Sequence, residues 1–139
     1  MKWVIDASFV AGLFLPDEMS EKVSALAKDL VKEEAGAPAL LQLEVTNIFL
    51  AASRRKRINT LQLKELSEAF EELPIVFHPP LTGPQRAEVL RLAQKHVLTA
   101  YDAAYLELAM RLGMALVSLD KSLVRAAMAE GVQIPRGLN

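Results

Sequence analysis

The chain has 139 residues, of which 52% are hydrophobic and 24% are charged, and its formal net charge at pH 7 is −1. This composition excludes a disordered chain, and the near-neutral charge means that any contact with nucleic acid must come from local positive patches. The absence of cysteine excludes disulfides, thiolate metal sites and cysteine nucleophiles.

The length predicts a single domain over residues 1–139. The longest apolar runs are far shorter than the ~18–20 residues that a membrane span needs. Only three apolar residues separate Lys2 from Asp6, which is too few for the apolar core of a signal peptide. We therefore expect a soluble, cytoplasmic protein without membrane contacts.

Apolar, strand-favouring segments recur along the chain and are bounded by acids, prolines or glycines. Each is only a few residues long, which predicts short strands. In chain order the segments are KWVID (2–6), GAPAL (36–40), PIVFHPP (74–80), MALVS (114–118) and VQI (132–134).

Helical patterns fill the intervals between these segments, and capping residues and helix stops give their limits. We expect helices from Ala7 to Pro16, from Asp17 to Gly36, from Pro38 to about Ser53, from Asn59 or Thr60 through Leu73, from the TGPQ capping box at 82–85, from Thr99 to Gly113 and from Asp120 to Gly131.

The alternation of strands and helices predicts a three-layer α/β/α sandwich with a short, mostly parallel central sheet and helices on both faces. In sheets of this kind, ligands bind outside the carboxyl ends of the strands. Polar residues that follow the strands are therefore the first candidates for a functional site.

Four acids are candidates. Three are aspartates that can lie at this edge of the sheet, and the fourth is a glutamate on an apolar helix face. Asp6 ends the first strand, and Asp120 follows the segment MALVS by two residues. Asp102 opens the helix that leads into that strand, so it can lie at the same edge of the sheet. Glu44 has mainly apolar helical neighbours, among them Leu41.

Each acid also has a purely structural interpretation. Asp6 and Asp120 are suited to cap helices, Asp102 can complete a capping box with Thr99, and Glu44 can extend its carboxylate to water. Capping alone, however, gives no reason for four acids to converge.

If the four acids do converge, their charges repel and require a neutralising partner. An all-oxygen cluster favours a hard cation such as Mg²⁺ or Mn²⁺. Zinc is disfavoured because the two histidines, His78 and His96, lie in unrelated places, which we interpret as a loop edge and a helix face.

Four ordered segments, VIDASF, LEVTN, TAYDAAYLELA and LVSLD, resemble the PIN-domain ribonucleases, and especially the VapC-type toxins of toxin–antitoxin pairs. The resemblance covers essentially the whole chain and implies a PIN-like fold. It implies that Asp6, Glu44, Asp102 and Asp120 are the catalytic, metal-binding residues. It also implies supporting polar roles for Ser8, Asn47 and Ser118.

The implied activity is endonucleolytic hydrolysis of RNA that depends on Mg²⁺ or Mn²⁺, in which a metal-bound water attacks the phosphate in line. The implied partners are the RNA substrate, a small antitoxin protein and a second copy in a homodimer. Candidate RNA-binding residues are Lys121 and Arg125, which adjoin the last aspartate, and Arg54 and Arg55, which can instead complement a helix dipole.

Other functions require residues that this chain lacks. A haloacid-type phosphatase has a second aspartate where this chain has Ser8, and a phospho-receiver has an aspartate where it has VFHPP. The remaining alternative is a catalytically silent PIN-like module that binds RNA or protein. A cleavage assay separates this alternative from a nuclease.

Overall fold

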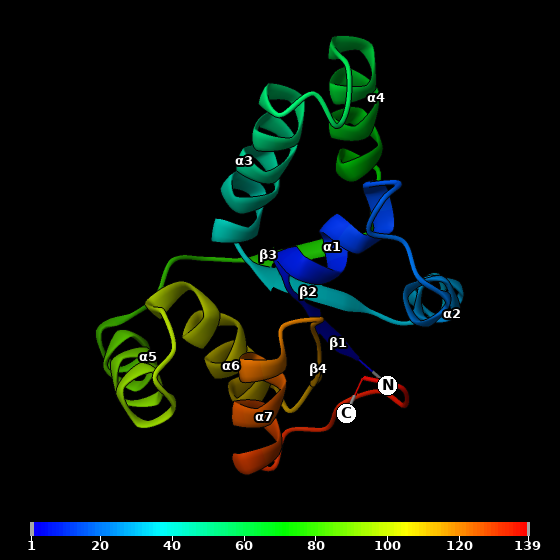
Figure 1. Cartoon of the computed structure of the whole chain (residues 1–139). Helices are drawn as coiled ribbons and strands as arrows, with labels where there is room; N and C mark the ends of the chain where they lie inside the picture. The colour runs from blue at the N-terminus through cyan, green and yellow to red at the C-terminus, as the bar shows by residue number, and fades with distance from the viewer. Residues whose placement is uncertain (1, 139) are drawn as a thin grey trace.

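A four-stranded sheet forms the centre of the computed structural model, which describes residues 2–138 (Figure 1). All adjacent strands are parallel, and their order is β3-β2-β1-β4. The strands are β1 (Trp3–Ile5), β2 (Ala35–Pro38), β3 (Ile75–His78) and β4 (Ala115–Val117). The predicted α/β class with a short parallel sheet is confirmed.

The helices lie on both sides of this sheet. The chain steps from β1 through β2 to β3 and then returns past β1 to β4. Because parallel crossovers are right-handed, the two directions of travel place their helices on opposite faces, and Figure 1 shows α5, α6 and α7 apart from α1–α4. The helices are α1 (Ala7–Phe14), α2 (Glu21–Leu30), α3 (Leu40–Arg54), α4 (Thr60–Glu71), α5 (Gly83–His96), α6 (Ala100–Leu112) and α7 (Lys121–Ala129).

Most of the helix limits follow the capping signals of the sequence. Asn59 and Thr82 each form a complete capping box with a glutamine three residues later. Gly113 ends α6 in the left-handed conformation, with φ of 64°, which glycine adopts without a Cβ clash.

The predicted limits of the second helix are wrong. Ser20, not Asp17, caps α2, because its side chain accepts the N–H of Val23. Asp17 lies in the preceding turn, where Arg57 donates to both of its carboxylate oxygens at 2.9 and 2.7 Å. A contact between residues distant in sequence has therefore taken the place of a local cap.

The helix stop predicted at Gly36 is also wrong, since α2 ends at Leu30 and Gly36 lies inside β2. A Cβ added at Gly36 would lie 3.2 Å from Nε2 of His78 on the neighbouring strand. Glycine therefore gives the imidazole of His78 room to pack over the backbone, as glycines inside strands often do.

The strand predicted at VQI is wrong as well, because residues 132–134 have no strand assignment. They run beside β4, where the carbonyl of Gln133 accepts the N–H of Leu116 at 2.9 Å. Pro135 follows at once and has no N–H to donate, so the segment does not extend into a fifth strand.

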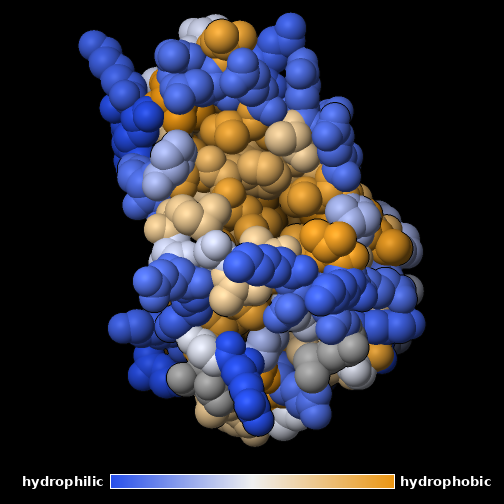
Figure 2. Space-filling model, turned by 90° about the vertical axis from the view of Figure 1, so that its right-hand side faces the viewer, coloured by the Kyte–Doolittle hydropathy of each residue, from blue (hydrophilic) through white to orange (hydrophobic). Residues whose placement is uncertain are grey.

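One side of the molecule carries an uncovered apolar region. Figure 2 shows it as a hollowed orange surface below a rim of hydrophilic residues, on the side where α2 and α4 lie. No residue of α4 is fully buried, and its apolar residues Leu63, Leu66 and Phe70 are only partly covered by the core. We call these three side chains the α4 face. None of the described helices is long and apolar enough to cross a membrane.

Candidate active site

Asp6 lies at the carboxyl end of β1 and is almost completely buried, with 3% of its surface exposed. It caps α1, because its Oδ1 accepts the N–H of Phe9 at 3.0 Å. The Ser8 hydroxyl donates to the same oxygen at 2.7 Å, and the Ser118 hydroxyl donates to Oδ2 at 2.5 Å. Both carboxylate oxygens are thus held in place by neutral donors.

The two serines connect the ends of β1 and β4. Ser118 is fully buried directly after β4, and its hydroxyl accepts the N–H of Asp120 at 3.0 Å. The Ser8 hydroxyl accepts the N–H of Leu119 at 2.9 Å. These bonds fix the loop that carries Asp120 against the loop that carries Asp6.

Asp120 and Asp102 occupy the first turns of their helices. Asp120 caps α7 and accepts the N–H of Leu123 at 2.9 Å. The Thr99 hydroxyl accepts the N–H of Asp102 at 3.1 Å. The predicted cap at Asp120 is therefore confirmed, whereas at α6 the cap is Thr99, and the described residues show no reciprocal bond from Asp102 that would close a capping box. Both acids lie at helix N-termini, where a negative charge is favoured.

Glu44 lies on α3 and is held by a residue of α6 that the sequence pattern did not single out. The hydroxyl of Tyr105, a residue with 1% of its surface exposed, donates to Oε1 of Glu44 at 2.6 Å. Tyr105 stands one helical turn after Asp102 on the same side of α6. That spacing next to a candidate acid is the signal from which it could have been found.

The pKa values show that the fields of these carboxylates overlap. Burial, together with a smaller effect of the charge of Asp102, raises the pKa of Asp6 to about 6, against its hydrogen bonds from Ser118, Phe9 and Ser8. Such mutual shifts require that the carboxylates lie near one another.

The same causes act on two more of the acids. The pKa of Glu44 is raised by burial and by the charge of Asp102. The pKa of Asp102 is raised by burial and by the charge of Asp120, and a hydrogen bond with Thr99 partly offsets this. Asp102 therefore stands within electrostatic range of each of the other three acids.

The chemistry of this donor set fits a hard divalent cation, because every donor is a carboxylate oxygen. Within residues 2–138, no lysine, arginine or histidine forms a salt bridge with any of the four acids. In the same part of the chain, no three acidic or histidine side chains converge on one point closely enough to hold a metal ion. The donors are suitable, but their rotamers are not those of a closed coordination sphere.

Three of the four residues predicted to bind RNA line cavities. Lys121 and Arg125 line a cavity of about 450 Å³ together with Ser118, and Arg55 lines a second cavity, of about 530 Å³, together with Ser8. Arg54 is exposed at the end of α3.

Asn47 is not joined to the network that holds Asp6. It is exposed on α3 one turn after Glu44, and its side chain makes no hydrogen bond within the described residues. Both histidines have partners elsewhere: Nε2 of His96 lies 2.7 Å from Oε2 of Glu130, and His78 packs over Gly36.

Comparison with known proteins identifies the family. The PIN domain family model matches residues 3–128. Ribonuclease VapC3 of Pyrobaculum aerophilum is 38% identical over 127 residues, which cover 88% of this chain and 92% of that protein. Ribonuclease VapC3 of Mycobacterium tuberculosis is 32% identical over 125 residues, which cover 88% of this chain and 85% of that protein.

Solved structures show the same fold at lower identity. The crystal structure of PAE2754 from Pyrobaculum aerophilum has a TM-score of 0.67 at 24% identity and covers 96% of this chain and 83% of its own. FitAB bound to a DNA fragment has a TM-score of 0.69 at 17% identity and covers 96% and 93%. Since the family model spans most of the sequence and relatives above 30% identity align over most of their length, this chain belongs to the PIN-domain family and, within it, to the VapC ribonucleases.

Proposed function

We propose that this ribonuclease is an endonuclease that uses Mg²⁺ or Mn²⁺ held by Asp6, Glu44, Asp102 and Asp120, and that it is the toxin of a toxin–antitoxin pair. The observation that carries the proposal is the overlap of four carboxylate fields at the carboxyl end of the sheet without a basic partner among the described residues. A cation is the partner that removes this repulsion.

When bound, the cation lowers the pKa of a water molecule and neutralises charge that develops on the phosphate. The residues of the chain hold and orient the carboxylates. Ser8 and Ser118 fix both oxygens of Asp6, and Tyr105 fixes Oε1 of Glu44. Such hydrogen bonds around ligating groups orient them for coordination.

The test compares wild-type protein with Asp6→Asn and Asp102→Asn on mixed single-stranded and structured RNA. We expect cleavage by the wild type with Mg²⁺ or Mn²⁺, loss of cleavage with EDTA, and loss of cleavage in both variants. Cleavage that persists in EDTA, or full activity in both variants, would refute the proposed metal site. RNA binding without any cleavage would instead indicate the silent binding module.

We also propose that partner chains, a second copy or an antitoxin, cover the α4 face. Partly covered apolar side chains at a hollowed surface are typical of interaction sites (Figure 2). A second copy in a homodimer is the partner that the purified protein can test directly.

Replacing Leu66 by lysine puts a charge on the α4 face, whereas replacing the outward-facing Lys64, whose side chain is 74% exposed, by glutamate does not. Sedimentation of the purified protein should show a dimer for the wild type and for Lys64→Glu, and a monomer for Leu66→Lys. If Leu66→Lys folds and remains dimeric, the second copy binds elsewhere. Co-expression with the protein encoded beside this gene then tests the same variants for antitoxin binding.

A further inference from the structure

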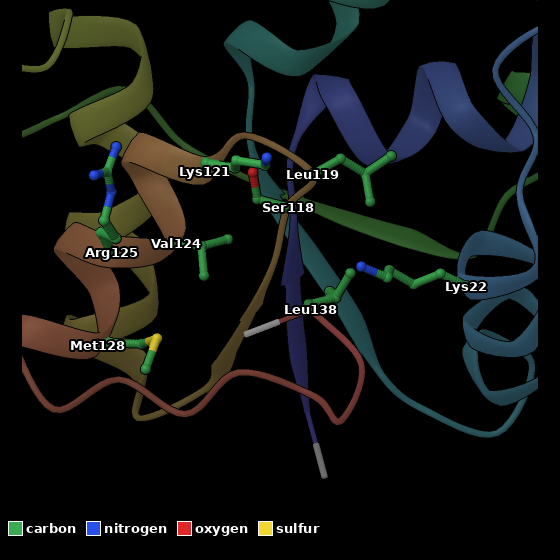
Figure 3. A pocket seen from close by; sticks show the side chains of 8 residues that line it. All are labelled: Lys22, Ser118, Leu119, Lys121, Val124, Arg125, Met128 and Leu138. Atoms are coloured by element: carbon green, nitrogen blue, oxygen red, sulfur yellow. The ribbon is translucent and has the colours of Figure 1, made fainter.

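The cavity that adjoins Ser118 is built from parts of the chain that are distant in sequence. It has a volume of about 450 Å³, which is within the range of about 300–1,000 Å³ found for small-molecule sites. Figure 3 shows Val124 and Met128 of α7 on one side, Lys22 of α2 on the other, and Leu138 near the end of the chain between them. Met128 is 51% exposed although its neighbours form the core.

The wall of the cavity is apolar and its rim is positively charged. Leu119, Val124, Met128 and Leu138 supply the apolar surface, and Lys22, Lys121 and Arg125 supply the positive charges. Within the described part of the chain, none of these three cations forms a salt bridge. Their charges are therefore available to an anionic ligand.

The cavity shares one wall residue with the proposed active site. Ser118 lines the cavity and also donates its hydroxyl hydrogen bond to Asp6. Lys121 is the residue directly after Asp120. Ser118 and Lys121 therefore place the cavity next to the loop that carries Asp120, although none of the four acids lines the cavity itself.

A single nucleotide combines the properties that this cavity matches. Its base is a flat aromatic ring with apolar faces, and its phosphates carry a negative charge that complements the positive rim. Unstacked bases of single-stranded RNA bind against apolar or guanidinium surfaces, and a methionine thioether makes favourable contacts with aromatic rings.

We propose that this cavity binds one unstacked nucleotide of the RNA, next to the scissile phosphate. The base lies against Met128 and Leu119, and Lys22 and Arg125 contact the flanking phosphates. This inference rests on the proposed ribonuclease function. It adds which residues hold a base beside the cleavage site, and it requires an unpaired nucleotide because a base within a duplex cannot enter the cavity.

Equilibrium binding in EDTA tests the cavity without requiring catalysis. The probes are a fluorescent single-stranded RNA oligomer and an oligomer of the same length that has the ribose-phosphate backbone but no bases. We expect the wild type to bind the RNA at least about tenfold more tightly than the abasic oligomer, a difference of about 1.4 kcal/mol.

Three variants separate the contacts. Met128→Ala should reduce the preference for the RNA over the abasic oligomer, because it removes apolar surface and no charge. Lys22→Met should weaken both oligomers to a similar degree, because it removes a phosphate contact. Lys28→Met is the matched control, since Lys28 is also exposed on α2 but does not line the cavity, and it should bind as the wild type does.

The outcomes are decisive in both directions. The inference is overturned if neither oligomer binds, if the wild type does not distinguish them, or if Met128→Ala leaves the preference unchanged. Cleavage of the same RNA after addition of Mg²⁺ is scored separately. Tighter binding of the RNA than of the abasic oligomer, without cleavage, would support the cavity and refute the proposed metal site. Cleavage by a protein that binds both oligomers equally would support the metal site and refute the cavity.

Discussion

Asp6 and Glu130 are both carboxylates held by short hydrogen bonds, yet their pKa values are shifted in opposite directions. Lys95 and His96 contact the same oxygen of Glu130, each at 2.7 Å, and they hold its pKa at about 2. Asp6 is held by hydroxyls and a backbone N–H, and burial raises its pKa to about 6.

The difference separates an acid used for structure from an acid suited to bind a ligand. The charge of Glu130 is neutralised by side chains of α5, so it joins the end of α7 to that helix. The charge of Asp6 has no neutralising partner among the described side chains, and nearby Asp102 adds to the repulsion. A strongly shifted acid indicates a functional site only when the cause of the shift is known.

The largest expected difference between Asp6 and Glu130 is in their effect on RNA cleavage. Asp6→Asn should reduce RNA cleavage at least about a hundredfold, because it removes a proposed metal ligand, while Glu130→Gln should change it less than about twofold. Initial cleavage rates with saturating Mg²⁺ and equal folded fractions by circular dichroism provide the measurement. Equal losses in the two variants would erase the distinction between the two acids.

The second expected effect concerns stability and pH. Because the folded-state pKa of Asp6 is raised, its contribution to stability is present below about pH 4 and is lost as pH rises through about 6. The loss amounts to about 3 kcal/mol at 1.36 kcal/mol per pKa unit. Urea unfolding of the protein in EDTA should therefore give a free energy of unfolding that falls between pH 4.5 and 7.5 more steeply in the wild type than in Asp6→Asn.

Part of this pH dependence should remain in Asp6→Asn, since the pKa values of Glu44 and Asp102 are raised as well. Added Mg²⁺ should reduce the loss in the wild type, because a cation that binds the ionised carboxylates stabilises the folded state. A wild-type profile as flat as that of Asp6→Asn would show that the burial of Asp6 carries no energetic cost.

A smaller effect is expected at Tyr105, which holds Glu44. Tyr105→Phe removes the 2.6 Å hydrogen bond and leaves the ring in the core, at a cost of about 0.5–1.5 kcal/mol in stability. Cleavage should fall by about tenfold, and a higher Mg²⁺ concentration should restore part of it, because a positioning residue acts on metal affinity. An activity loss that Mg²⁺ does not reduce would argue against that role.

The smallest effect is expected for the stability of Glu130→Gln. The Glu130 side chain is only 8% exposed, but its partner Lys95 is 53% exposed and solvent screens that pair, so the loss at pH 7 should be about 1 kcal/mol. Because the pKa of Glu130 is lowered, this contribution is present above about pH 4.5 and is lost as pH falls through about 2. Thermal unfolding at pH 7 with and without high salt checks it, and a larger loss would mean that the cluster is less hydrated than its exposure indicates.

The elements that were predicted correctly depend on short-range chemistry. Asn59 and Thr82 cap their helices through residues three positions later, and Gly113 ends α6 through its own backbone conformation. The strands around Val4 and Leu116 are apolar because both faces of the parallel sheet are covered. The four acids were selected as candidates by the same kind of local pattern, since three follow a strand or open a helix and Glu44 lies on an apolar helix face, and their role stays a prediction.

The errors and omissions depend on contacts between distant parts of the chain. Asp17 does not start a helix because Arg57 binds it. Gly36 does not stop a helix because it lies in a strand under His78. Tyr105 was missed because its partner, Glu44, is on another helix.

The sequence by itself determined the class of the fold and most of its elements in order, and it selected the four candidate acids, because capping, strand patterning and motif spacing act over a few residues. Only the tertiary structure decided which neighbours those acids have. It joined Ser8 and Ser118 around Asp6, placed Asp102 within range of the other three acids, and built a cation-rimmed cavity from α2, α7 and the end of the chain. Burial and mutual charge, which set the pKa of a carboxylate, exist only after these distant segments have packed together.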